Sequence, residues 1–139
     1  MTPENVHLPI SNLREFGGYK TADGRTIKAG VLYRCGHMSE LTPEQTDTYR
    51  ALKLKTIIDL RRDDEVADRP TPQFGDETNI HLSVSDPDNA FAEAAARAHE
   101  PDGAKIILGE AARYYTEIVT HNVHRYTSVM ECIFEAANL

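Results

Sequence analysis

The sequence predicts an α/β fold with a short, parallel-rich sheet flanked by helices. The first indication is the apolar, largely β-branched run Thr56–Leu60, which is typical of a strand covered on both faces. The second is the order of elements before it, a strand at Val31–Arg34 followed by a helix that begins at Thr42. A strand, a helix and a second strand form a βαβ unit, so we expect these two strands to be parallel.

Length and composition limit the class of protein. The chain has 139 residues, which predicts a single domain over residues 1–139. Its net charge of −7 argues against non-specific binding to nucleic acid or to an anionic membrane. No apolar run approaches the roughly 20 residues that span a bilayer, and the first residues do not resemble a secretory signal. Two cysteines are too few for a disulfide scaffold, so we expect a cytoplasmic protein.

The helix after the first strand has clear end signals. Thr42 is the predicted N-cap, Pro43 occupies the first helical position, and Gln45 completes a capping box. We expect this helix to reach about Leu52, with Tyr49 and Leu52 among its buried positions.

Turn signals and periodicity predict the other elements. The adjacent Gly17 and Gly18 indicate a positive φ or a close backbone approach, and Asp23-Gly24 predicts a turn between short strands. Further elements are expected on the C-terminal side: a short helix or loop at Asp63–Pro72, a strand at Asn79–Val84, a helix at Ala90–Ala98 capped by Asp88 or Asn89, and a long helix at Arg113–Ala137. The end of the long helix carries an apolar stripe made of Tyr126, Val129, Met130, Ile133, Phe134 and Ala137.

Charged side chains follow the buried strand. Asp59, Arg61 and Arg62 cluster at its C-terminal end. Ligands of open α/β sheets bind outside the carboxyl ends of the strands, so these residues could form a binding rim. The alternative is a surface ion pair that ends the strand.

Five motifs in order resemble one family. They are Asn12-Leu13-Arg14-Glu15-Phe16-Gly17-Gly18-Tyr19, Asp23-Gly24-Arg25, Gly30-Val31-Leu32-Tyr33-Arg34, Leu41-Thr42 and Ile58-Asp59-Leu60-Arg61. This set resembles the atypical, dual-specificity-like tyrosine phosphatases of bacteria and fungi, some of which act on phosphoinositides. The resemblance covers roughly residues 8–85. Two departures are Glu15, where aspartate is usual, and Cys35, where serine is common.

The resemblance implies a cysteine phosphatase whose nucleophile lies in a His-Cys-x5-Arg loop. In that chemistry a thiolate attacks phosphorus, and backbone N–H groups and the arginine hold the phosphate oxygens. Neither cysteine here begins such a loop, because Leu41 stands six positions after Cys35 and Asn138 six after Cys132. We therefore expect the N-terminal part of a phosphatase domain, incomplete at the C-terminus and inactive alone.

The resemblance also implies which residues line the phosphate site. Arg34, Asp59 and Arg61 are expected to form its outer wall, with strand-end ion pairing as the alternative. Arg14 and Asn12 are expected there too, with a structural Asn-Arg loop clamp as the alternative. Asp86 follows the third strand and could be the general acid, or a turn residue before Pro87.

Two functions remain open from the sequence. The first is hydrolysis of phosphotyrosine, other phosphoresidues or phosphoinositides. The second is a non-catalytic phosphate- or phosphoprotein-binding module, a pseudophosphatase. We expect no cofactor and no metal, since His121 and His124 lack an evident third ligand. The expected partners are the phosphorylated protein or phosphoinositide substrate and, to replace the missing strand, the C-terminal remainder of the same protein or a second copy.

Overall fold

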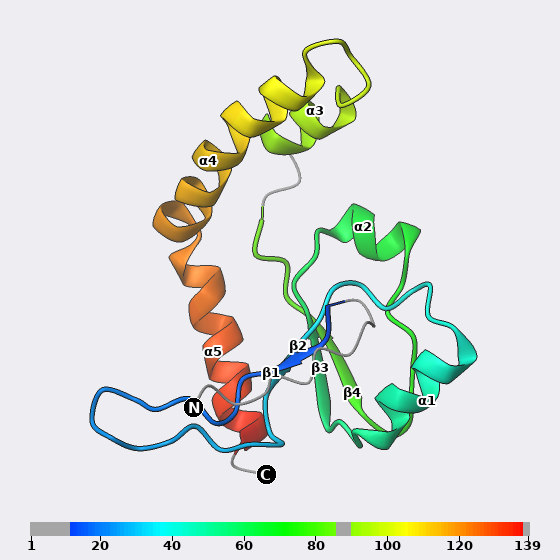
Figure 1. The fold of residues 1–139 in the computed structure, drawn as a ribbon, viewed down its shortest axis with the longest axis vertical. Helices are drawn as coiled ribbons and strands as arrows, with labels where there is room; N and C mark the ends of the chain where they lie inside the picture. Colours follow the sequence, from blue (N-terminus) through cyan, green and yellow to red (C-terminus); the bar gives the residue numbers. More distant parts are fainter. Residues whose placement is uncertain (1–11, 86–89, 138–139) are drawn as a thin grey trace. The chain divides into compact units, whose positions relative to one another are not determined.

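The computed structural model describes residues 12–85 and 90–137, which form a mixed α/β structure (Figure 1). These residues belong to two compact units. The first unit contains residues 12–54 and 71–77, and the second unit contains residues 55–70 together with the chain from residue 78 onward. None of the described helices is both long and apolar enough to cross a bilayer.

A two-stranded antiparallel ladder begins the first unit. Strand β1 (Arg14–Glu15) pairs with strand β2 (Tyr33–Arg34), which places Arg14 opposite Arg34 and Glu15 opposite Tyr33. Strand β2 is shorter than the predicted Val31–Arg34. The ladder is extended by one further backbone hydrogen bond, from the Phe16 N–H to the Leu32 carbonyl at 2.9 Å.

The segment between β1 and β2 folds back on itself as the glycines and the Asp-Gly turn predict. A Cβ atom on Gly17 would collide with the backbone of Ala29, and Gly18 has a φ of 82°. Gly24 has a φ of 84°, which L side chains rarely adopt. The predicted strands around this turn are reduced to one bridge between Lys20 and Thr26.

Helix α1 (Pro43–Ala51) confirms the predicted capping box. The Gln45 N–H donates to the Thr42 Oγ1 at 3.3 Å, and the Thr42 N–H donates to the Gln45 Oε1 at 2.9 Å. These two bonds satisfy amide groups that have no partner inside the helix.

The core of the first unit centres on the buried face of α1. Tyr49 is 1% exposed, and its ring stacks on that of Phe74 with the centroids 5.1 Å apart. Leu13 and Met38 are also buried. Phe74 comes from a segment distant in the chain, and its N–H is held by the buried Glu77 carboxylate at 2.6 Å.

The second unit contains the parallel strands. Strand β3 (Thr56–Asp59) pairs with strand β4 (Thr78–His81) in parallel, with Ile57 buried and Asp59 in register with His81. Helix α2 (Asp63–Asp68) lies between them in the chain, so the parallel unit is β3-α2-β4. The predicted parallel pairing of Val31–Arg34 with Thr56–Leu60 is wrong. Strand β2 has its ladder with β1 instead, in a separate sheet.

Three helices follow the sheet of the second unit. They are α3 (Ala90–Ala96), α4 (Gly103–His121) and α5 (Val123–Ala137). The predicted single helix Arg113–Ala137 is therefore wrong. The helix begins ten residues earlier, and it breaks at Asn122, a buried residue with φ −100° and ψ 20°. Asparagine favours such non-helical conformations because its side chain competes for backbone hydrogen bonds.

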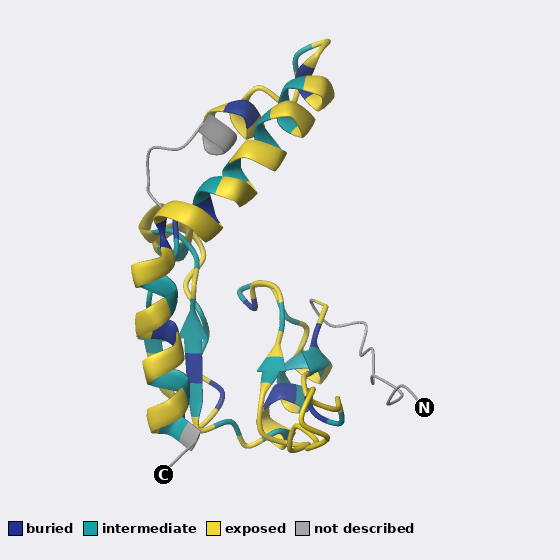
Figure 2. Ribbon diagram, turned by 90° about the vertical axis from the view of Figure 1, so that its left-hand side faces the viewer, coloured by how far each residue is buried: buried dark blue, intermediate teal, exposed yellow. Residues whose placement is uncertain are grey.

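Large parts of these helices are exposed (Figure 2). Ile118 on α4 and Val129 on α5 are buried, whereas Met130 and Phe134 in the predicted apolar stripe of α5 are 50% and 63% exposed. The stripe is therefore only partly covered. The predicted caps Asp88 and Asn89 lie outside the described residues.

Candidate functional site

Two of the predicted phosphate-binding residues face each other in the first unit. Arg14 and Arg34 are direct partners in the β1–β2 ladder, so their side chains share one face of it. Arg34 is exposed and Arg14 is half-buried. Like charges placed directly opposite each other on two strands repel and destabilise the pairing.

No acidic side chain among residues 12–85 and 90–137 forms an ion pair with either of these arginines. The acidic neighbour of Arg14, Glu15, projects to the other face, where its carboxylate accepts a hydrogen bond from the Gly30 N–H. There burial and the Glu15 charge raise the pKa of Tyr33. The face that carries Arg14 and Arg34 is thus positively charged, and a bound anion would reduce the repulsion between the two arginines.

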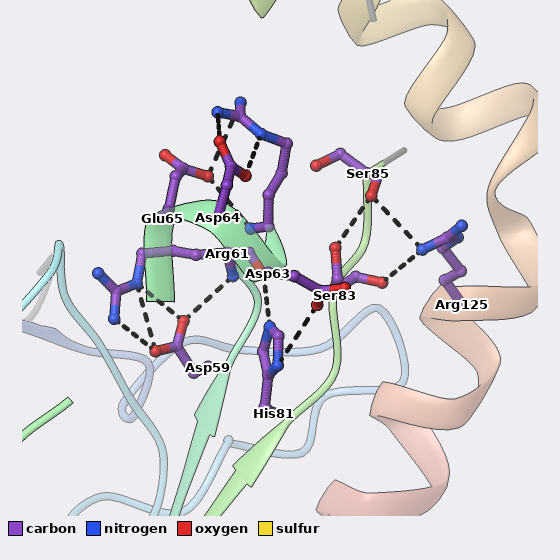
Figure 3. Close-up of polar contacts among 10 residues, drawn as sticks. Asp59, Arg61, Asp63, Asp64, Glu65, His81, Ser83, Ser85 and Arg125 are labelled. Carbon is purple, nitrogen blue, oxygen red and sulfur yellow. Dashed lines mark hydrogen bonds and ion pairs between the residues drawn. The ribbon is translucent and has the colours of Figure 1, made fainter. Parts of the chain in front are cut away.

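Asp59 and Arg61 form a close ion pair at the carboxyl end of β3 (Figure 3). The Arg61 Nε donates to the Asp59 Oδ1 at 3.0 Å, and its Nη2 donates to Oδ2 at 2.7 Å. The Arg61 backbone N–H also donates to Oδ1 at 3.1 Å. These bonds raise the pKa of Arg61 and fix its orientation. The ion pair that the sequence left open as the alternative role is therefore present.

Arg62, the third charged residue of the predicted rim, is engaged by helix α2. Its guanidinium donates to Asp64, with Nε to Oδ1 at 2.9 Å and Nη2 to Oδ2 at 3.0 Å. Its backbone N–H donates to the Glu65 Oε2 at 3.1 Å and so closes the first turn of α2. Arg62 therefore stabilises the start of this helix.

Sequence reasoning missed His81, which lies at the same end of the sheet. Its ring Nε2 donates to the Arg61 carbonyl at 2.7 Å, and its Nδ1 lies 3.7 Å from an Asp63 carboxylate oxygen (Figure 3). The link joins the end of β4 to the turn after β3. Only the parallel register brings these residues together, because they are 20 positions apart in the chain.

Arg125 on α5 was also not predicted. Its Nη1 donates to the carbonyls of Ser83 and Ser85 at 3.1 and 3.4 Å, which fastens α5 to the segment that leaves β4 (Figure 3). Ser85 is buried. The next residue, Asp86, is the predicted general acid and lies outside the described residues.

The remaining predicted residues have separate positions. Asn12 is exposed with a φ of 55°, and among the described residues it makes no hydrogen bond to Arg14, so the loop clamp is not formed. Cys35 follows β2 and Cys132 lies on α5, and both are half-buried. Within the described part of the chain, no three His, Cys, Asp or Glu side chains gather closely enough to hold a metal ion.

Comparison with known proteins identifies the family of the chain. No curated protein matches the chain. A family model described as the tyrosine phosphatase family matches residues 7–139, which is nearly the whole sequence. The chain therefore belongs to the tyrosine phosphatase family.

Proposed function

We propose that this chain supplies the phosphate-binding wall of a phosphoric monoester hydrolase that acts on phosphotyrosine, other phosphoresidues or phosphoinositides. The observation that carries the proposal is the Arg14–Arg34 pair on one face of the β1–β2 ladder, with no acidic partner among the described residues. Two guanidinium groups offer the forked N–H donors that match phosphate oxygens. A bound phosphate would also cancel their mutual repulsion.

The Asp59–Arg61 pair has a different role in this proposal. Because Asp59 holds both Nε and Nη2 of Arg61, the guanidinium is presented in one orientation at the carboxyl end of β3. Within the second unit, the pair would offer one guanidinium to a phosphate at the edge of a parallel sheet, where ligands of α/β proteins bind. The substrate class follows from the chemistry of the phosphatases that the chain resembles.

The nucleophile would come from polypeptide beyond these 139 residues. Neither Cys35 nor Cys132 has an arginine six positions later. Positioning arginines cannot replace a nucleophile, because phosphate monoesters are among the slowest substrates to hydrolyse without a catalyst. The remainder of the same protein would supply the loop and its strand. We also expect the protein to act in the cytoplasm.

The alternative function is a non-catalytic module that binds phosphate groups or phosphoproteins. The observation in its favour is the same lack of a Cys-x5-Arg motif within the chain. The gene sequence downstream of codon 139 separates the two. A reading frame that continues into His-Cys-x5-Arg favours the hydrolase, and a stop codon favours the binding module.

The direct test is hydrolysis of an aryl phosphate by the full product of the gene. For the hydrolase we expect turnover, and we expect Arg34→Ala to lower kcat/KM by about tenfold or more, since a hydrogen bond to a charged group is worth roughly 1.5–3 kcal/mol. Arg25→Ala is the matched control, because Arg25 is exposed in the same unit and is paired with Asp23. Turnover that is equally insensitive to both substitutions would overturn the proposed role of Arg34.

A further inference from the structure

The two peptide units on either side of Arg61 have partners for all four of their polar groups. In the unit before it, the Leu60 carbonyl accepts a hydrogen bond from the Val84 N–H at 3.3 Å. The Arg61 N–H of the same unit donates to the Asp59 Oδ1 at 3.1 Å. This planar unit is therefore held at both ends, which leaves the φ angle of Arg61 little freedom.

In the peptide unit after Arg61, both polar groups are held by side chains (Figure 3). The Arg61 carbonyl accepts from the His81 Nε2 at 2.7 Å, and the Arg62 N–H donates to the Glu65 Oε2 at 3.1 Å. A carbonyl oxygen only accepts, so the His81 Nε2 carries the proton. Glu65 is a near neighbour in the chain, whereas His81 belongs to another strand and lies 20 positions from Arg61. His81 is therefore the group that ties this peptide unit to the sheet.

The His81 side chain acts where the main-chain ladder ends. His81 is the last residue of β4, and the segment after β4 donates its own N–H groups to the Asp59 and Leu60 carbonyls, at 2.9 and 3.3 Å. After Arg61 the chain enters α2, and the Arg61 carbonyl is held by the His81 ring. A substitution can remove this side-chain bond and leave the main-chain bonds of the ladder in place.

We propose that His81 is a positioning residue for phosphate binding, because its hydrogen bond to the Arg61 carbonyl fixes the orientation in which the Arg61 guanidinium meets a phosphate. This role rests on the proposed phosphate-binding function. Asp59 fixes the guanidinium relative to the backbone, with Nε and Nη2 at 3.0 and 2.7 Å from its oxygens, and His81 fixes that backbone relative to the sheet. An arginine that is ordered before binding loses less conformational entropy when it binds a phosphate.

The positioning itself is tested by hydrogen exchange of backbone amides in the full product of the gene. His81→Leu removes the donor, whereas His81→Gln keeps a side-chain N–H donor of similar reach. We expect His81→Leu to speed exchange of the Arg61 and Arg62 amides by about fivefold, the size of one hydrogen bond, and His81→Gln to restore their protection. The Thr78 amide, which donates to the Lys55 carbonyl at the other end of the ladder, should be unchanged. No change at Arg61 and Arg62, or equal acceleration at all three amides, would overturn the proposal.

The consequence for phosphate chemistry is tested by hydrolysis of an aryl phosphate by the same protein. We expect His81→Leu to lower kcat/KM by about fivefold and His81→Gln to restore most of it. Arg61→Ala should lower kcat/KM by about tenfold or more, and adding His81→Leu should then cost less than about twofold, because the guanidinium that His81 positions is gone. The matched control is His99→Leu, since His99 is an exposed histidine of the same unit.

The outcomes distinguish the role of His81 from the proposed function. If Arg34→Ala lowers turnover but His81→Leu does not, or if His81→Leu has the same effect with and without Arg61, the positioning role is wrong and the phosphate-binding function stands. If the wild type shows no turnover, or turnover that is insensitive to Arg34→Ala, the proposed function is wrong and the role of His81 is wrong with it.

Discussion

Arg14 and Arg34 lie directly opposite each other on one face of the β1–β2 ladder, and neither has an acidic partner among the described residues. Local sequence does not require this arrangement, since the two residues are 20 positions apart. This arrangement places two positive charges together, and their repulsion destabilises the folded state. A site that is destabilised without its ligand is typical of functional positions.

Removing one of these charges should therefore stabilise the free protein. We expect Arg34→Gln to raise the free energy of unfolding by about 0.2–1 kcal/mol, the usual size of a cross-strand charge interaction. Urea unfolding in a buffer free of multivalent anions measures this change in unfolding free energy. The control is Arg113→Gln, which removes an exposed arginine that is paired with Glu117. A loss of stability in Arg34→Gln would show that Arg34 makes a favourable contact.

Breaking the ion pair at the end of β3 should have the opposite effect. The Asp59 and Arg61 side chains are only 11% and 19% exposed, so Asp59→Asn leaves a guanidinium largely out of water without its carboxylate. We expect a loss of about 3 kcal/mol in unfolding free energy. The matched control is Asp47→Asn, which breaks the exposed pair with Arg50 and should cost less than about 1 kcal/mol. Equal losses would show that the Asp59–Arg61 pair is no stronger than a surface pair.

The carboxylate of Asp64 should make stability depend on acid. The hydrogen bond from Arg62 holds the pKa of Asp64 below its ordinary value of 3.8 in the folded state. The stabilisation is therefore fully present above pH 3.8, and it is lost as the pH falls through the lower, folded pKa. Asp64→Asn should flatten this part of the curve of unfolding free energy against pH. Curves of unfolding free energy that have the same slope in wild type and variant, as the pH falls from 3.8 through the folded pKa, would contradict the assignment.

The parts of the fold that could be predicted depend on local chemistry. The capping box at Thr42, the close approach at Gly17 and the ion pair between Asp59 and Arg61 each involve few neighbouring residues, and all are present. Strand pairing could not be predicted in the same way. The order of strand, helix and strand allowed the Val31–Arg34 strand to pair with β3, and the antiparallel ladder with β1 was formed instead.

In the candidate site too, local features could be predicted from the sequence, whereas contacts between distant segments could not. The sequence placed Arg34 and Arg61 at the ends of short apolar strands, and the family resemblance added Arg14. Their role in binding phosphate stays a prediction. That Arg14 faces Arg34, and that His81 holds the Arg61 carbonyl, depend on ladder register between distant segments. The break of the predicted long helix at Asn122 was missed because neither a glycine nor a proline marks it in the sequence.

The chain is expected to associate with a second polypeptide, either another copy of itself or the remainder of the same protein. Within residues 12–85 and 90–137, β3 and β4 have only each other as ladder partners, and strands with free edges invite pairing with another chain. Leu108, Tyr115 and Val119 on α4 are each more than 60% exposed. We expect the pure chain to self-associate, or to be well folded only with a second polypeptide. Sedimentation that shows a strictly monomeric, cooperatively melting species at low micromolar concentration would contradict this expectation.

The most direct test of the central claim is calorimetric titration of the 139-residue chain with inorganic phosphate and with tungstate, which has the same tetrahedral shape. The account predicts one saturable site that is lost in Arg14→Ala and Arg34→Ala and retained in Arg25→Ala. It also predicts that phosphate raises the melting temperature of the wild type and of Arg25→Ala only. Binding that survives loss of both Arg14 and Arg34, or no binding by a folded wild type, would contradict the claim that these two residues form a phosphate site.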